Sequence, residues 1–254
     1  MKNESINSQN PYVKKSYAWY MVLLMTMAYM FSFIDRYILG LLIDPIKADL
    51  GLSDTQMGLL LGPAFAIFYA TMGLPLGYLA DRVKRVSIVS IGIFIWSLAT
   101  VASGFAQKFS HLFLARMTVG IGEATLSPCA LSMITDSFPE KNRGKPIGFY
   151  TMGMSFGPAI AYLSGAAVLF WSQSIDSIQI PLIGDIAPWQ LAFIVVGFPG
   201  MLLAIFVYFL KEPPRKEDPN LENKEKPTIV EALKYFYSKA GAMCSFILPA
   251  CVMT

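Results

Sequence analysis

The feature of this sequence that most restricts its fold is a series of long segments without a charged side chain. Residues 55–80, 86–107 and 189–210 contain 26, 22 and 22 residues with no Asp, Glu, Lys or Arg, and residues 146–175 contain none either. At a rise of about 1.5 Å per residue, 22 helical residues cover about 33 Å, enough to cross a hydrocarbon core of about 30 Å. A helix satisfies its own backbone hydrogen bonds in lipid, and these runs lack the alternation of barrel strands. The sequence therefore predicts an all-α integral membrane protein.

Two further apolar stretches, residues 16–43 and 109–135, contain charges and bring the expected number of membrane-spanning helices to six. The predicted organisation is a cytoplasmic tail at 1–15, a six-helix domain at 16–210, a cytoplasmic linker at 211–239 and the beginning of a seventh helix at 240–254.

The composition excludes several classes of protein. The chain is 55% hydrophobic and 15% charged, whereas soluble domains average about 45–50% and about 25%. A net charge of +3 gives no indication of a nucleic-acid partner. One histidine and three cysteines form no zinc-ligand pattern, so we expect no metal and no cofactor. The sequence has no nucleophile–base pattern, and we do not expect an enzyme.

The part of the chain that follows residue 210 differs in character. Residues 211–226 are rich in proline and charge, which is typical of a solvated loop. Thr228 and Glu231 then form a capping-box pattern before a short amphipathic helix, which lies either at the membrane interface or in a plain loop. Residues 240–254 are apolar but too short to span, so we expect them to begin a seventh helix of a longer protein.

The distribution of lysine and arginine predicts the orientation. With the N-terminus inside, the tail, the inner loops and the linker hold 16 of the 20 cations, and the outer loops hold two. The positive-inside rule therefore places the N-terminus in the cytoplasm. The expected location is a bacterial inner membrane.

Four ionisable residues lie within the spans: Asp35, Arg36, Arg116 and Glu123. A charge at mid-bilayer costs about 2.5–3.5 kcal/mol on insertion scales, and these four sum to zero. Their depths permit Asp35 to meet Arg116 and Arg36 to meet Glu123. The pairs either serve structure alone or mark a polar cavity or ion relay. A carboxylate changes its proton affinity when it gains or loses an arginine, so we expect Asp35 and Glu123 to couple transport to protons.

The turn after residue 76 contains a motif. Gly77, Asp81, Arg82 and Arg85 resemble the G-x-L-x-D-R-x-x-R signature of the major facilitator superfamily, between its helices two and three. Gly77 is expected to allow close helix approach, and Asp81 to cap or pair with a neighbouring helix. The alternative is a solvated run of charges.

Further motifs agree with that resemblance. Residues 116–122 resemble the R-x-x-x-G-x-G motif of the same superfamily, and FIDRYILG in the first span and EPPR at 212–215 resemble its Spinster-like branch. The resemblance implies the N-terminal six helices of a twelve-helix secondary transporter that works by alternating access. It implies protons, a small organic or lipid-like substrate and a missing C-terminal half as partners. The alternative is a membrane scaffold, or a half-transporter that works only as an assembly.

The fifth span contains small residues at regular spacing. Gly153, Gly157 and Pro158 resemble the glycine-proline motif of helix five in that superfamily, and the same spacing suits a plain helix-packing face. Tyr69 and Met154 are candidates for lining a substrate path.

The orientation predicts accessibility. In a chain whose native cysteines are replaced, Lys84→Cys should react with a membrane-impermeant thiol reagent only from the cytoplasmic side, because inner loops hold the cations. Lys108→Cys is the matched control and should react from outside. Efficient labelling of position 84 from outside would contradict the topology.

Overall fold

The structure is a computed structural model that describes residues 14–172, 178–180 and 184–215. All of these belong to one compact unit. Three predictions lie outside the described residues: most of the cytoplasmic tail, the amphipathic helix after Thr228 and the seventh helix at 240–254.

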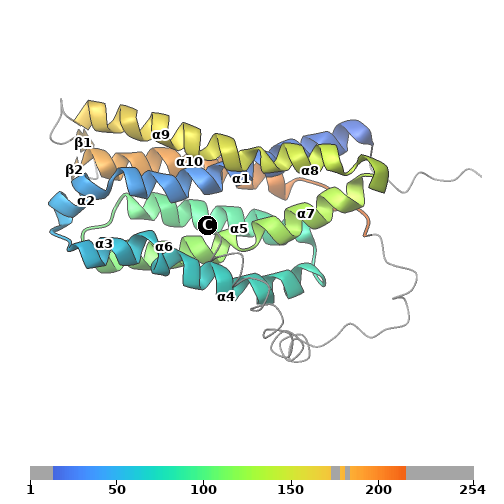
Figure 1. The fold of residues 1–254 in the computed structure, drawn as a ribbon, viewed down its shortest axis with the longest axis horizontal. Coiled ribbons are helices and arrows are strands. Elements are labelled where there is room, and N and C mark those ends of the chain that lie inside the picture. Colours follow the sequence, from blue (N-terminus) through green and yellow to red (C-terminus); the bar gives the residue numbers. More distant parts are fainter. Residues whose placement is uncertain (1–13, 173–177, 181–183, 216–254) are drawn as a thin grey trace, which may run out of the picture. The chain divides into compact units, whose positions relative to one another are not determined.

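The unit is a helical bundle with one short hairpin (Figure 1). Its elements are α1 (Lys15–Leu41), α2 (Ile43–Leu50), α3 (Asp54–Leu61), α4 (Pro63–Ala80), α5 (Arg85–Ser103), α6 (Phe109–Glu123), α7 (Leu126–Ser137), the 3₁₀ turn η1 (Glu140–Asn142), α8 (Gly144–Thr151), α9 (Gly153–Ser172), β1 (Ile178–Ile180), β2 (Gly184–Ile186) and α10 (Pro188–Tyr208). The strands pair antiparallel, with Ile178 opposite Ile186. The sequence did not anticipate this hairpin.

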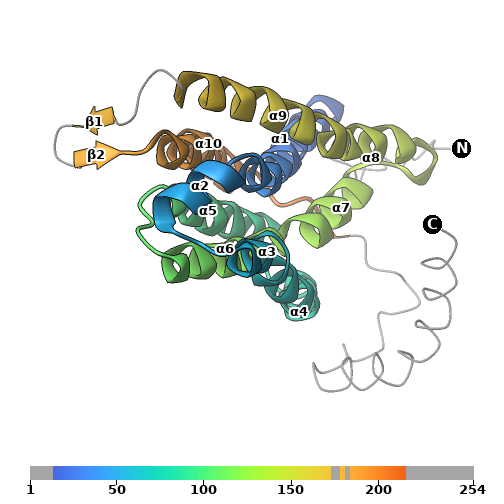
Figure 2. The ribbon, with the colours of Figure 1, turned by 60° about the vertical axis from the view of Figure 1, so that its left-hand side comes forward.

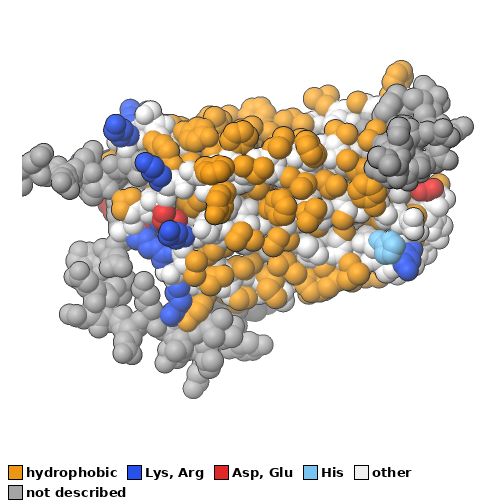
Figure 3. All heavy atoms as spheres, turned by 180° about the vertical axis from the view of Figure 1, so that it is seen from behind, with side chains coloured by type: hydrophobic (Ala, Val, Ile, Leu, Met, Phe, Trp, Pro, Cys, Tyr) orange, Lys and Arg blue, Asp and Glu red, His pale blue; other side chains and the backbone are white. Residues whose placement is uncertain are grey.

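Five segments among the described residues are long and apolar enough to cross a membrane. They are α1, α3 with α4, α5, α6 with α7, and α10. The predicted fifth span corresponds to α8 and α9, which pack beside α1. Figure 3 shows hydrophobic side chains over the middle of the bundle and Lys and Arg gathered towards one end.

That end, which we call the basic end, holds ten of the twelve Lys and Arg that the described residues contain besides Arg36 and Arg116. They are Lys14, Lys15, Arg82, Lys84, Arg85, Lys141, Arg143, Lys145, Lys211 and Arg215. The opposite end holds Lys47 and Lys108. The cations that alternate from loop to loop along the sequence are therefore gathered at one end of the folded bundle.

Three spans predicted as continuous helices are each divided in two, and the last of these breaks lies at Met152, between α8 and α9. The other two lie nearer the N-terminus, between α3 and α4 and between α6 and α7. At the first break Gly62 has non-helical dihedral angles, φ −116° and ψ −83°, and Pro63 has no backbone N–H to donate. At the second, between α6 and α7, the Thr125 N–H bonds the Gly122 carbonyl at 3.2 Å, a 3₁₀-type bond. The second break directly follows Glu123, where α6 ends.

Helices α5 and α6 approach each other closely at two glycines. A Cβ added at Gly122 would lie 2.9 Å from the Gly92 carbonyl oxygen and 2.9 Å from the Trp96 Cβ. A Cβ at Gly92 would lie 2.0 Å from the Thr125 Oγ1. The backbones of α5 and α6 therefore touch beside Glu123. A side chain larger than glycine at Gly92 or Gly122 would push the two helices apart.

This close approach predicts the effect of one methyl group. Gly122→Ala should destabilise the bundle by about 1–3 kcal/mol, since the rigid neighbours are backbone and a tryptophan stem. Gly73→Ala on α4 is the matched control, because its new Cβ would meet nothing within 4 Å, and it should be neutral or stabilising. The measurement is thermal unfolding in detergent, and equal midpoints for the two variants would contradict the close packing.

Candidate functional site

Two ion pairs join α1 to α6 inside the bundle. The Arg36 guanidinium donates to Glu123 Oε2 from Nε at 2.8 Å and from Nη2 at 2.5 Å. Arg116 Nη1 lies 3.1 Å from Asp35 Oδ2, and both of its Nη atoms also approach the Asp35 carbonyl at 3.3 Å. These are the two pairings that the sequence depths permitted.

Helix direction explains which residues meet. Helices α1 and α6 run antiparallel, and helical side chains tilt towards the N-terminus of their own helix. Arg36 therefore reaches towards the basic end, where α1 begins, and meets Glu123 at the end of α6. Arg116 reaches the other way and meets Asp35. Two adjacent residues on α1 thus serve two residues seven apart on α6.

Both carboxylates are buried and receive a hydroxyl as well as an arginine. Ser32 Oγ donates to Glu123 Oε2 at 2.7 Å. The Thr100 hydroxyl of α5 lies 2.8 Å from Asp35 Oδ1 and 2.9 Å from the Trp96 carbonyl oxygen, so its one proton has two acceptors. Glu123 Oε1 is buried and has no hydrogen-bond partner among the described residues. The acid therefore uses only one of its two oxygens.

Aromatic rings surround the more open arginine. The Arg36 Cζ lies 4.6 Å from the ring centre of Phe65, 5.0 Å from that of Tyr69 and 5.1 Å from that of Phe33. Its side chain keeps 27% of its surface exposed, whereas that of Arg116 keeps 3%. Arg36 is therefore the member of this cluster that a ligand can reach.

The two residues predicted to line a substrate path, Tyr69 and Met154, have different surroundings. Tyr69 lies against Arg36. Met154 is half exposed on α9, and none of the described contacts of the two ion pairs includes it. Sequence reasoning missed Ser32, Thr100 and Phe65, because nothing in the chain order relates these residues to charges on another helix.

A second cluster lies at the basic end around Arg85, the first residue of α5. Arg85 is buried, and it pairs with Asp136 of α7 at 2.5 Å and with Glu212 at 2.7 Å. Glu212 also accepts from the Val86 N–H at 3.0 Å. The Arg215 guanidinium donates to the carbonyls at the end of α4: Ala80, Asp81 and Val83. Residues 212–215, expected in a solvated linker, are thus fixed to three helices.

The other residues of that motif have different surroundings. Gly77 meets nothing within 4 Å of an added Cβ, so the expectation of close helix approach there is wrong for the described part of the chain. Asp81 is exposed, and its contact with Arg215 uses the backbone carbonyl. The Arg82 guanidinium lies 4.2 Å from the ring centre of Tyr78.

The glycines of α9 pack against α1. A Cβ added at Gly153 would lie 2.9 Å from the Thr26 carbonyl oxygen, and one at Gly157 would lie 2.5 Å from the Phe33 Cβ. Pro158 is inside α9, one residue beyond this contact. The small-residue face therefore holds α9 close to the helix that carries Asp35 and Arg36.

Comparison with known proteins places this arrangement in a family. Residues 25–254 match the family model described as Major Facilitator Superfamily, and the chain belongs to this superfamily of membrane transporters. The structure resembles that of a bacterial homolog to the human lysosomal transporter Spinster, in an inward-facing and unoccupied conformation. That match has a TM-score of 0.74 and 38% identity, and it covers 90% of this chain and 50% of the other.

Curated relatives agree. The probable L-galactonate transporter of Escherichia coli strain K12 is 33% identical over 74% of this chain and 38% of its own length. Protein spinster homolog 1 of Xenopus tropicalis is 33% identical over 80% of this chain and 37% of its own length. The chain thus spans about half the length, or less, of the relatives it matches. The expected Spinster-like N-terminal half of a major facilitator fold is confirmed.

The Arg85 cluster predicts a stability difference between two neighbouring arginines. Arg85→Gln would leave two carboxylates facing each other without their cation, which for buried pairs costs about 3–5 kcal/mol. The low end applies, since Asp136 and Glu212 keep 15% and 23% exposure. Arg82→Gln, at an exposed position where a contact such as that with the Tyr78 ring contributes about 0.5–1 kcal/mol, should lower the unfolding midpoint less. Equal midpoints for the two variants in detergent would rule out the structural role of Arg85.

Proposed function

We propose that this chain forms one half of a proton-coupled secondary transporter that moves a small organic anion by alternating access. The observation that carries the proposal is the pair of ion bridges between α1 and α6, with an acid in each. Charged groups inside membranes are costly, and they are typical of ion relays and substrate paths. In secondary transporters of this kind the substrate and ion sites lie near the membrane midplane, between the two halves. The ion pairs of this half are proposed to form one side of such a site.

In the proposed coupling step, Glu123 takes up a proton and weakens its hold on Arg36. A neutral carboxyl gives up the charge attraction, and its second oxygen, Oε1, is the atom without a present partner. Arg36 is then free to bind an anion, and loss of the anion favours deprotonation and return of the ion pair. Asp35 follows the same logic with Arg116, and the Thr100 hydroxyl turns between Asp35 and the Trp96 carbonyl.

The surroundings of Arg36 support the class of solute. A partly exposed guanidinium suits a carboxylate or phosphate, and the three rings around it suit an apolar part of the same molecule. One relative is named as a probable transporter of L-galactonate, which is a carboxylate. These features favour an organic or amphiphilic anion as the solute. They argue against a scaffold without transport, because such a protein would not need charged residues inside its membrane-spanning helices.

We also propose that the basic end faces the cytoplasm and that residues 211–239 form the link to a second six-helix half. Ten cations at one end against two at the other support this orientation in a bacterial inner membrane.

The coupling role predicts the outcome of removing titration without removing shape. When the chain is supplied with a second six-helix half, Glu123→Gln should keep counterflow of the solute but lose accumulation driven by a pH gradient. The loss should be about tenfold or more if protonation of Glu123 contributes more than about 1.4 kcal/mol to accumulation. Asp35→Asn should weaken the same dependence. Glu140→Gln, at an exposed carboxylate, is the matched control.

If both Glu123→Gln and Asp35→Asn keep the wild-type dependence on the gradient, the acids serve structure alone. Loss of counterflow together with loss of folded protein would equally assign them to structure.

The proposal also predicts that the 254-residue chain alone does not transport, because its helices supply one wall of a path that needs two. The measurement is uptake by liposomes that contain only this chain. Robust uptake would contradict the one-wall proposal and would require two copies to assemble.

A further inference from the structure

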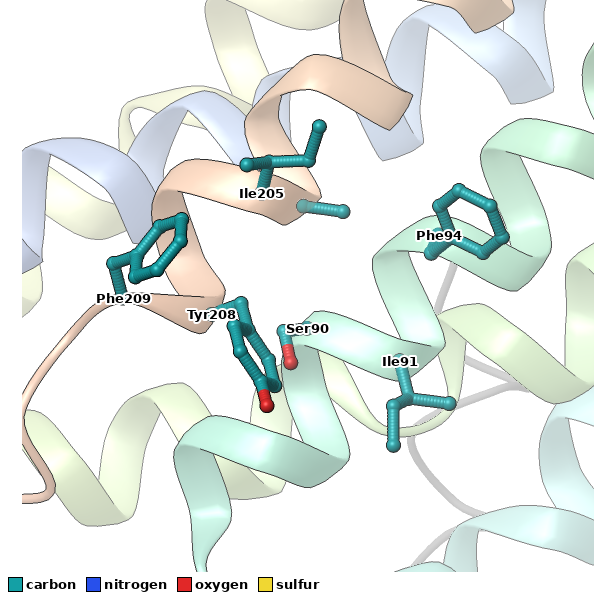
Figure 4. Close-up of a pocket in the computed structure, with 7 residues that line it drawn as sticks. Ser90, Ile91, Phe94, Ile205, Tyr208 and Phe209 are labelled. Atoms are coloured by element: carbon teal, nitrogen blue, oxygen red, sulfur yellow. The ribbon is translucent and has the colours of Figure 1, made fainter.

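A groove lies on the outer surface of the bundle between α5 and α10. Its volume is about 280 Å³. Ser90, Ile91 and Phe94 of α5 line one side, and Ala204, Ile205, Tyr208 and Phe209 line the other (Figure 4). Figure 2 shows α5 and α10 next to each other on one side of the bundle, with α7 on the opposite side. None of the residues that line the groove takes part in the ion pairs between α1 and α6.

The packing of the two helices explains why the groove exists. Near the middle of α10 they touch, since a Cβ added at Gly197 would lie 2.8 Å from the Ser97 carbonyl oxygen and one at Gly200 would lie 2.2 Å from the Ser97 Oγ. One turn further along, Ala204 and the larger Ile205 and Tyr208 replace the glycines. The helices separate there, and the groove fills the space between the crossing and the basic end.

The lining indicates a hydrocarbon ligand. Ser90 is buried, and its hydroxyl already donates to the Ser87 carbonyl at 3.0 Å. Ile91 and Ile205 are more than half exposed and lie within the membrane-spanning part of their helices. Small-molecule sites usually measure about 300–1,000 Å³ and present several polar groups, so this groove suits one flexible acyl chain better than a whole solute.

The ends of the groove indicate which lipid. Lys84 immediately precedes α5, and Lys211 follows Phe209 by two residues; both side chains are exposed. Ser90 is five residues into α5, about 7.5 Å along the helix, so the groove ends close to the level of these lysines. Long lysine side chains reach to the headgroup layer, where they attract anionic lipid. Glu212, the acid next to Lys211 in the chain, is held in an ion pair by Arg85, which also pairs with Asp136.

We propose that this groove, the α5–α10 groove, binds one acyl chain of an anionic phospholipid, with its phosphate at Lys84 and Lys211. The lipid is a bound component of the half-bundle and is distinct from the transported solute. It fills the space left by the diverging helices and exchanges with the surrounding bilayer.

The test uses the full chain in liposomes that contain phosphatidylglycerol or phosphatidylcholine with a photoreactive acyl chain. Peptide mapping after illumination should find label concentrated on Ile91, Phe94, Ile205 and Phe209, above the label on Ile67 of α4, which is similarly exposed. Phosphatidylglycerol should label these positions better than phosphatidylcholine. Uniform labelling of α4, α5 and α10, or no label in the groove because another segment or copy covers it, would overturn the proposal.

Variants sharpen the test. Ala204→Phe fills the groove and should abolish the concentrated label, whereas Ala70→Phe, at an exposed position on α4, should not. Because Ala204 is buried, Ile205→Ala provides a second variant that removes an exposed wall, and it should also reduce the label. Unchanged groove labelling in both variants would overturn the site.

The headgroup contact has its own variants. Lys84→Gln and Lys211→Gln should each reduce the preference for phosphatidylglycerol about fivefold, the factor for one cation near an anionic surface. An undiminished preference in the double variant, or no preference in the unaltered chain, would overturn the anionic assignment.

Discussion

The bundle depends on two ion pairs in its interior, in which Asp35, Arg116 and Glu123 are buried and Arg36 is partly buried. Asp35 and Glu123 are buried acids, and each ion pair spans α1 and α6. Removing any one charge would leave its partner uncompensated in a medium of low dielectric constant. The register of α1 against α6 is therefore fixed by chemistry as well as by packing, because a slip of one turn would separate both pairs together.

The packing around the pairs supports this register from three directions. Gly153 and Gly157 bring α9 onto the face of α1, and Gly122 brings α6 onto α5. Thr100 of α5 then reaches Asp35, and Phe65 of α4 reaches Arg36. The charged cluster is thus surrounded by helices whose approach distances are set by missing side chains. Small residues allow the helices to come close, and the ion pairs and hydrogen bonds fix how the helices are aligned.

The sequence alone predicts the spans and the pairing partners, because charge and hydropathy are properties of single residues and depth follows from position along a helix. It also predicts the family, through motifs at 77–85 and 116–122. It does not predict which oxygen of Glu123 is used, or that Ser32 and Thr100 share the acids, since these depend on helix rotation. Gly77, expected to allow close helix approach, has no such neighbour among the described residues. The sequence also gives no sign that residues 212–215 are fixed to the bundle, because their charges read as solvated until Arg85 is placed beside them.

The attachment of residues 212–215 has a mechanical consequence. The chain leaves α10 and is immediately held by Arg85 through Glu212, and by the last carbonyls of α4 through Arg215. Tension applied from beyond residue 215 would therefore not peel α10 away from its neighbours. It would be distributed to the ends of α4, α5 and α7, so that these helix ends would move together with the start of the linker.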